Sequence, residues 1–300
     1  MRIGLALGGG GLTGTAFHAG VLTALAEHFD AREAEVIVGT SAGSTAAALM
    51  RSGFPPRDYV PRVAGRPMSA EGHAILGSMP PLSDPMPPAP RRRAPASADL
   101  ARAVVRRPWR YRPGVVVSAL LPAGTRPMDP GAVRLRALFD RWPDKPTWIV
   151  AVDLQTGARV AFGRDQPADM GDAVAASCAV PGYFEPVVIA DRRYVDGGAY
   201  SMVSLDLLAD QHLDLVIVSA PLSTSDWFAR DPGNVPRVAM RRQLTREARA
   251  VRRSGTRIIT VAPDAALRAI MGTNSMVVAK RAPVALATQA YAADVFRRKL

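Results

Sequence analysis

A serine flanked by two glycines is the first feature that indicates chemistry. Gly39-Thr40-Ser41-Ala42-Gly43 has the pattern Gly-X-Ser-X-Gly, and it lies between the apolar run 36–38 and a small-residue helix expected over 42–50. A sharp strand-to-helix turn exposes the serine hydroxyl and points the helix N-terminus at it. A plain Gly/Ser-rich turn also fits the pattern, but the strand–turn–helix context favours Ser41 as a nucleophile.

A serine nucleophile needs a base, and Asp196 is the best-placed candidate. Tyr194-Val195-Asp196-Gly197-Gly198 puts a carboxylate at the end of a short strand, before two glycines that allow a tight turn. A carboxylate within hydrogen-bond reach accepts a hydroxyl proton directly, although Asp-Gly is also a common turn dipeptide. The histidines are less well placed for this role, and we expect them to be structural or solvated: His18, His28, His73 and His212.

A glycine-rich loop, residues 8–14, follows the first apolar run. Its backbone amides and the following helix N-terminus suit an anion, either a nucleotide phosphate or the oxyanion of acyl transfer. Gly9-X-Gly11-X-X-Gly14 satisfies the dinucleotide fingerprint, with Glu33 or Glu35 at a suitable distance downstream. Because the next strand ends in the serine turn, we favour an oxyanion hole formed by the amides of Gly8, Gly9, Gly10 and Gly11.

The order of elements predicts an α/β fold with a mostly parallel sheet covered on both faces. Buried strands are expected at 1–7, 36–38 and 213–220, a hairpin at 148–152 and 160–162, and a further strand at 257–262. Helices are expected at 14–28, 167–178, 236–253 and 284–298. We therefore predict a single catalytic domain over residues 1–300 rather than two domains.

The stretch 54–145 differs in composition from the rest. It is dense in proline and contains Arg91-Arg92-Arg93 and the run 106–112, in which arginines alternate with Trp109 and Tyr111. We interpret it as an inserted, partly mobile cap or lid, with disorder expected within 79–97 and helices near 97–107 and 130–141. The run 106–112 fits either a membrane interface or a solvated loop.

The chain is strongly basic, and most of its positive charge is arginine. The formal net charge is +12 over 300 residues, with lysine only at Lys145, Lys280 and Lys299. Such a surface favours anionic partners, with a membrane preferred here over nucleic acid, or it is simply solvated. The single cysteine, Cys178, forms no internal disulfide, and no signal peptide or membrane span is evident. The sequence predicts a cytoplasmic protein with possible peripheral contact with an anionic membrane.

These motifs, in this order, resemble the patatin-like phospholipase family. The loop 8–14 is similar to its oxyanion motif, 39–43 to its serine turn, and Asp196-Gly197 to its Asp-Gly motif. The block 176–186, which contains Cys178, is similar to a further family block. Thr13 departs from the Arg or Lys that members often carry there.

The resemblance implies a three-layer α/β/α sandwich and hydrolysis of lipid acyl esters on a Ser41–Asp196 dyad. It implies neither a cofactor nor a metal, and Cys178 is expected to be a small core residue. Two alternatives stay open from the residues alone. One is a nucleotide-dependent oxidoreductase using the glycine loop, and the other is a non-catalytic lipid- or nucleic-acid-binding protein of the same fold.

Overall fold

The computed structural model describes residues 1–77, 94–128, 135–225 and 235–300. Its strands are β1 (Ile3–Leu7), β2 (Val36–Thr40), β3 (Thr147–Asp153), β4 (Arg159–Phe162), β5 (Val187–Ile189), β6 (Arg192–Asp196), β7 (Leu215–Ser219) and β8 (Arg257–Val261). Its α-helices are α1 (Gly11–Leu25), α2 (Ala42–Arg51), α3 (Tyr59–Ala64), α4 (Ala70–Leu76), α5 (Ala98–Arg106), α6 (Pro113–Leu120), α8 (Met170–Cys178), α9 (Val235–Arg253), α10 (Ala265–Met271) and α11 (Arg281–Lys299). The 3-10 helices are η1 (Ala31–Glu33), η2 (Pro56–Asp58), η3 (Pro108–Arg110), η4 (Gly197–Ala199), η5 (Leu205–Leu208) and η7 (Val278–Lys280).

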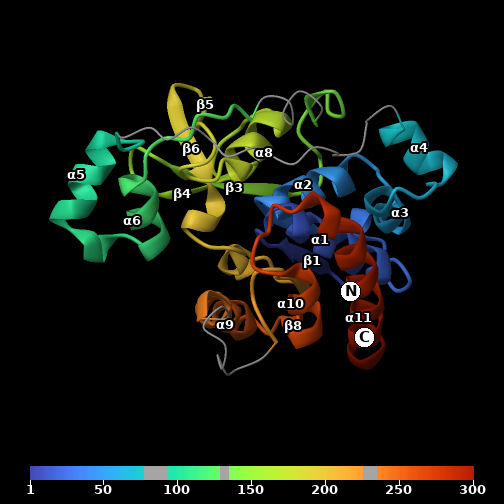
Figure 1. Cartoon of the computed structure of the whole chain (residues 1–300). Coiled ribbons are helices and arrows are strands. Elements are labelled where there is room, and N and C mark those ends of the chain that lie inside the picture. The colour runs from blue at the N-terminus through green and yellow to red at the C-terminus, as the bar shows by residue number, and fades with distance from the viewer. Residues whose placement is uncertain (78–93, 129–134, 226–234) are drawn as a thin grey trace.

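One eight-stranded mixed sheet forms the centre of the molecule (Figure 1). Its strands lie in the order β5-β6-β3-β2-β1-β7-β8, with β4 on β3. The five strands β3, β2, β1, β7 and β8 are parallel, whereas β4 and β6 run antiparallel to β3. The predicted α/β class with a largely parallel centre is confirmed, and so is the hairpin of β3 and β4.

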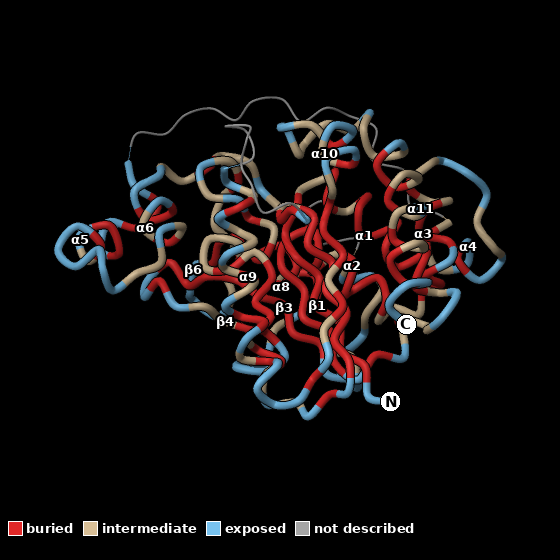
Figure 2. Tube along the Cα trace, turned by 90° about the horizontal axis from the view of Figure 1, so that it is seen from below, coloured by how far each residue is buried: buried red, intermediate tan, exposed pale blue. Residues whose placement is uncertain are grey.

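Alternate residues of the central strands bury against different helical layers. Leu5 and Ile37 pack in one core with α1, α2, α8 and α11, while the adjoining Ala6 and Val38 pack in a second core with η5 and α9. This period of two is what a sheet covered on both faces requires. Figure 2 shows the central strands as buried tubes with exposed segments outside them, which is the predicted α/β/α layering. In the described parts of the chain, no helix has the length and apolarity needed to cross a membrane.

The proline-rich stretch 54–145 packs in more than one place. Phe54, Tyr59 and Leu76 belong to the same core as α1 and α11. Helices α5 and α6 instead form a separate small core with Val152 and Val195 at the edge of the sheet. Arg91–Arg93, most of 79–97 and the start of the helix expected at 130–141 lie outside the described residues. A cap spanning all of 54–145 stays a prediction.

Candidate active site

The sheet register brings the ends of β2 and β6 together. Strand β4 occupies one edge of β3 along 149–152, so β2 and β6 share the other edge. Thr40 is the last residue of β2 to pair with β3, opposite Val150, and Asp196 pairs with the next residue, Ala151. Thr40 and Asp196 therefore occupy successive positions along β3, so Ser41, which follows Thr40, lies beside Asp196 although 154 residues separate the two in the sequence.

Ser41 lies in a strained backbone turn between β2 and α2. Its φ is 53° and its ψ is −120°, a conformation that L-residues rarely adopt. A Cβ at Gly43 would lie 1.9 Å from the carbonyl oxygen of Leu7, and one at Gly39 would lie 2.7 Å from that of Gly43. Both flanking positions thus require glycine, which explains the Gly-X-Ser-X-Gly pattern in steric terms.

Ser177, on α8, holds this turn against the sheet. The Ser41 N–H donates to Ser177 Oγ at 2.8 Å, and Ser177 Oγ donates to the Val150 carbonyl at 2.6 Å. Ser177 is fully buried, so this hydroxyl satisfies two backbone groups that water does not reach. Sequence reasoning missed this role, because the only signal was an Ala-Ser pair in the block 176–186.

Asp196 is a buried carboxylate beside Ser41. The Ser41 hydroxyl hydrogen-bonds to it, and the Gly198 N–H donates to its Oδ1 at 2.7 Å. Burial raises the pKa of Asp196 to about 6, and the hydrogen bonds from Ser41 and Gly198 oppose that rise. The group is consequently ionised at neutral pH and far more basic than an exposed aspartate, as a general base must be.

The glycine loop lies directly against Ser41, but two of the four amides predicted as oxyanion donors are already engaged. The Gly8 N–H donates to the Ser219 carbonyl at 2.9 Å and the Gly9 N–H to the Met202 carbonyl at 2.8 Å. Gly8 and Gly9 are therefore not available as oxyanion donors, which corrects that part of the sequence prediction. Within the described residues the amides of Gly10 and Gly11 have no carbonyl partner, since they open α1.

Neither His18 nor His212 is placed to accept a proton from the Ser41 hydroxyl. His18 is fully buried, its Nε2 donates to the Gly8 carbonyl at 2.7 Å, and its Nδ1 accepts from Ser219 Oγ at 2.7 Å. Burial lowers the pKa of His18 to about 4, with the Gly8 hydrogen bond opposing, so the ring is neutral and fixes the glycine loop to β7. His212 lies before β7, and its carbonyl accepts from Arg2 at 3.0 Å. It is thus at the opposite end of the strands from Ser41.

Cys178 lies close to Asp196 and to the first turn of α2. Its Sγ lies 3.6 Å from Ser44 Oγ and 3.8 Å from Thr45 Oγ1, both on α2. Burial, with the nearby charge of Asp196, raises the pKa of the Cys178 thiol to about 12. The thiol stays protonated and serves as a small packing group rather than a second nucleophile.

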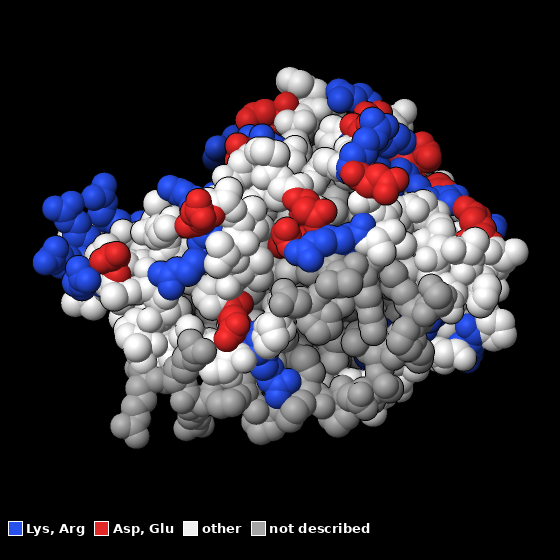
Figure 3. Space-filling model, turned by 90° about the horizontal axis from the view of Figure 1, so that it is seen from above, with Lys and Arg blue, Asp and Glu red and all other residues white. Residues whose placement is uncertain are grey.

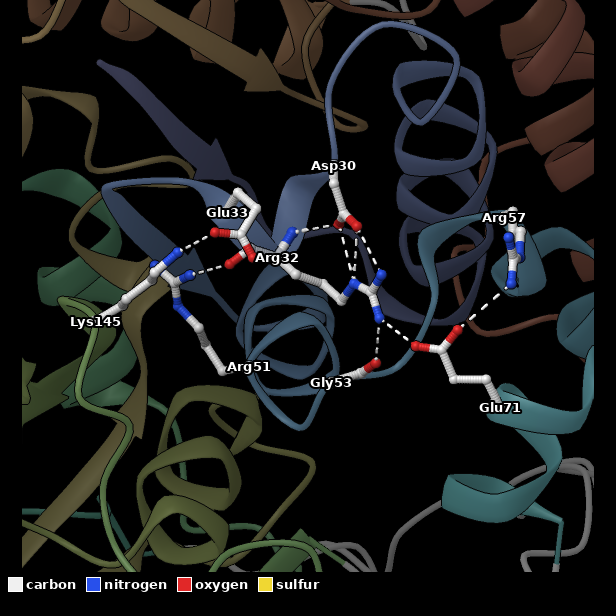
Figure 4. Close-up of polar contacts among 8 residues, drawn as sticks. All are labelled: Asp30, Arg32, Glu33, Arg51, Gly53, Arg57, Glu71 and Lys145. Carbon is white, nitrogen blue, oxygen red and sulfur yellow. Dashed lines mark hydrogen bonds and ion pairs between the residues drawn. The ribbon is translucent and has the colours of Figure 1, made fainter. Parts of the chain in front are cut away.

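The two acids considered for a dinucleotide site lie at the wrong end of the sheet. Glu33 and Glu35 precede β2, whereas the glycine loop follows the carboxyl end of β1, and these strands are parallel. Glu33 pairs with Lys145 at 2.5 Å and lines a hollow of about 730 Å³ beside Arg51 (Figure 4). This hollow is therefore remote from Ser41, and neither Glu33 nor Glu35 reaches a ribose at the glycine loop.

Figure 4 also shows how the start of the proline-rich stretch is fastened to the domain. Arg32 pairs with Asp30 at 2.7 Å and with Glu71 of α4 at 2.5 Å, and Arg57 reaches Glu71 at 3.4 Å. These ion pairs and the buried Tyr59 hold residues 54–77 against the helical layer that contains α1 and α11.

Comparison with known proteins decides the family. The model of patatin-like phospholipases matches residues 5–209, which include the glycine loop, the serine turn and Asp196. The chain belongs to the patatin-like phospholipase family.

Two solved structures of larger proteins are similar to this patatin-like protein. VipD from Legionella pneumophila matches with 14% identity and a TM-score of 0.45, covering 99% of this chain and 66% of VipD. The type III effector protein ExoU matches with 16% identity and a TM-score of 0.40, covering 99% of this chain and 53% of ExoU. The patatin-like chain therefore spans about two thirds of one structure and half of the other.

Thr13, at the position where patatin-like proteins often carry a cation, is buried inside this fold. It is 1% exposed on α1, and its N–H donates to the Ser275 carbonyl at 3.0 Å. The loop here is thus held by backbone contacts with the segment before η7. Position 13 therefore adds no charged side chain beside the glycine loop, where the N-terminus of α1 supplies a partial positive charge.

Proposed function

We propose that this protein hydrolyses lipid acyl esters through a covalent acyl-Ser41 intermediate, with Asp196 as its general base. The observation that carries the proposal is the buried hydrogen bond from Ser41 to Asp196, whose pKa burial raises to about 6. No histidine among the described residues takes the base position beside Ser41.

The first half of the reaction transfers the acyl group to the enzyme. Asp196 takes the Ser41 proton as Ser41 Oγ forms a bond to the ester carbonyl carbon, and the carbonyl oxygen becomes the oxyanion. The free amides of Gly10 and Gly11, at the N-terminus of α1, are the proposed donors to that oxyanion. When the intermediate collapses, the bond to the alcohol breaks and the departing oxygen takes the proton from Asp196.

The second half repeats the same proton path with water. Asp196 takes a proton from a water molecule as that water attacks the acyl carbon. The bond to Ser41 Oγ then breaks, and the proton returns from Asp196 to Ser41, while the fatty acid leaves. No step requires a redox or phosphate cofactor. The proposal is therefore a serine carboxylic-ester hydrolase of the phospholipase A or lysophospholipase type.

The test is the hydrolysis of a soluble short-chain ester by Ser41→Ala, Asp196→Asn and the double variant. Each single variant should lose several orders of magnitude in kcat, and the double variant should be no worse, because the two groups act as a unit. Ser52→Ala, at the far end of α2, is the matched control and should keep full activity. Near-normal turnover by Asp196→Asn would overturn the dyad, and a fully inactive wild type would favour the non-catalytic alternative.

A further inference from the structure

The helices α5 and α6 form a projecting unit at one edge of the sheet, which we call the docking lobe, residues 95–122. An isolated bridge between Pro95 and Pro122 closes its base, and η3 joins the two helices at its tip. Figure 1 shows the lobe standing away from the helical layers that cover the sheet. The lobe contains five arginines and a single acidic residue, Asp99.

The arginines at the tip of the lobe are exposed and unpaired among the described residues. Arg102 pairs with Asp99 at 3.1 Å, and Arg112 stacks on Tyr200 at 4.5 Å. Arg106, Arg107 and Arg110 have no ion pair to any part of the chain that the structure describes. Figure 3 shows this gathering of basic side chains at the α5 end of the molecule. The tip therefore presents uncompensated positive charge to an anionic partner.

Large apolar side chains share the same tip. Trp109 is 79% exposed and Val105 is 69% exposed. On α5, Leu100, Ala101 and Val104 face the lobe's core, so Val105 lies on the outer face with Arg102 and Arg106. An exposed indole beside arginines is typical of side chains that sit at the headgroup level of a bilayer. A nucleic acid would complement the positive charge of the tip, but it would not account for the exposed apolar side chain of Val105.

The lobe is attached to the chain that leaves the dyad. Helix α6 packs on η4, the three residues that directly follow Asp196. The approach is so close that a Cβ at Gly114 would lie 2.3 Å from the Ala199 carbonyl oxygen. A hollow of about 420 Å³ lies between η3 and Tyr200, and it is lined by Arg110, Arg112 and Tyr111. Guanidinium groups and rings at this hollow suit a lipid phosphate.

We propose that the docking lobe seats the protein on an anionic lipid bilayer, with Arg106, Arg107 and Arg110 on lipid phosphates and Trp109 in the headgroup layer. The inference rests on the proposed function and deepens it, since the lobe packs on η4, directly after Asp196. Binding itself does not depend on catalysis and is measured separately.

The experiment is vesicle co-sedimentation of the full chain carrying Ser41→Ala, which silences hydrolysis. The protein should bind phosphatidylcholine–phosphatidylserine vesicles at low salt and bind pure phosphatidylcholine vesicles much more weakly. Replacing Arg106, Arg107 and Arg110 with Gln should weaken binding to the anionic vesicles about 100-fold, since each arginine near the surface contributes about fivefold. High salt should abolish most of the difference between the two vesicle types.

Matched controls separate the lobe from net charge and from misfolding. Arg242, Arg246 and Arg249 lie on α9, and their replacement by Gln removes the same charge elsewhere. The α9 variant should bind anionic vesicles almost as well as the protein without these replacements. When Ser41 is restored, both the α9 and the lobe triple variants should hydrolyse the soluble ester at the normal rate. Trp109→Ala should weaken binding several-fold at high salt, where the arginines are screened.

Three results would overturn the proposal. Equal binding to neutral and anionic vesicles at low salt would remove the electrostatic basis. Equal losses in the α9 and lobe variants would reduce the effect to net charge. If replacing Arg106, Arg107 and Arg110 with Gln abolished binding to single-stranded DNA but left binding to anionic vesicles intact, the lobe would be a nucleic-acid surface instead. None of these results bears on soluble-ester hydrolysis, so docking and catalysis fail independently.

Discussion

Replacing the proposed base should make the protein more stable at neutral pH. Asp196 is 5% exposed, and burial raises its pKa from 3.8 to about 6 in the folded state. An asparagine side chain at this position would fill the same space, accept from the Gly198 N–H through its amide oxygen and carry no charge. Asp196→Asn therefore removes the cost of holding an ionised carboxylate in a buried site.

The magnitude follows from the pKa difference between the folded and unfolded states. A carboxyl whose pKa rises from 3.8 to about 6 on folding destabilises the folded protein by about 3 kcal/mol once it is fully ionised. Because folding raises the pKa of Asp196, its carboxyl keeps the proton between pH 3.8 and about 6 in the folded state and loses it in the unfolded state. The contribution of Asp196 to the free energy of unfolding of wild type therefore falls as the pH rises through this range, and it is constant at higher pH.

The assay is urea unfolding of wild type and Asp196→Asn, followed by tryptophan fluorescence, across a pH series. The stability of the variant relative to wild type should rise by about 2.5 kcal/mol between about pH 4 and about pH 7.5. His18 has the opposite slope, because burial lowers its pKa to about 4 and stability is lost as pH falls below 6.5. That slope is present in both proteins and cancels in their difference.

Asp206→Asn is the control with the opposite sign. Burial favours the protonated form of Asp206, but the hydrogen bonds and charge of Arg159 outweigh it and lower the pKa of Asp206. Its replacement should therefore cost stability at neutral pH, and the cost should fade as pH falls. A pH-independent difference between wild type and Asp196→Asn would refute the reasoning, because Asp196 would not be a buried carboxylate with a raised pKa.

Three further outcomes follow from the site. Ser177→Ala should lower kcat about 10- to 100-fold with KM unchanged, since it frees the Ser41 turn, and Ser177→Thr should restore kcat because it keeps the hydroxyl. Gly43→Ala should cost about 3 kcal/mol or more in urea unfolding, because its Cβ meets the Leu7 carbonyl oxygen at 1.9 Å. Gly65→Ala is the matched control, because a Cβ there would have no atom within 4 Å although φ is +67°. It should lower the free energy of unfolding by only about 1 kcal/mol. EDTA should leave ester turnover unchanged, because no group of three or more His, Cys, Asp or Glu side chains in the described stretches is placed to hold a metal ion; activity lost in EDTA and restored by calcium would contradict this.

The sequence predicts those parts of the fold that local patterns specify. Strand runs such as 36–38, and 215–218 within the predicted strand 213–220, are buried on both faces, so they are continuous in apolar residues and easily recognised. Ser41 and Asp196 were predictable because each sits beside glycines at the end of a strand. That they meet depends on the register along β3, where Ala151 pairs with Asp196.

Contacts between distant segments were beyond the reach of the sequence. The Gly8 and Gly9 amides are engaged by carbonyls at Ser219 and Met202, about 200 residues away, so the loop's free donors were misassigned to all four glycines. Glu247 on α9 gives a second example. It is 5% exposed and accepts from Ser201 Oγ at 2.6 Å and from the Leu205 N–H at 3.0 Å. Nothing in the run of arginines around it indicated a buried anchor for the loop after Asp196.

The measurement that tests the central claim most directly is fluorophosphonate labelling of the intact protein, with the labelled residue mapped by peptide mass. The probe reacts only with a serine whose proton is removed in place, and it needs no knowledge of the natural lipid. One label should appear, on Ser41, and it should be absent in Ser41→Ala and strongly slowed in Asp196→Asn. Folded protein that stays unlabelled, or labelling that proceeds at full rate in Asp196→Asn, would contradict the Ser41–Asp196 dyad.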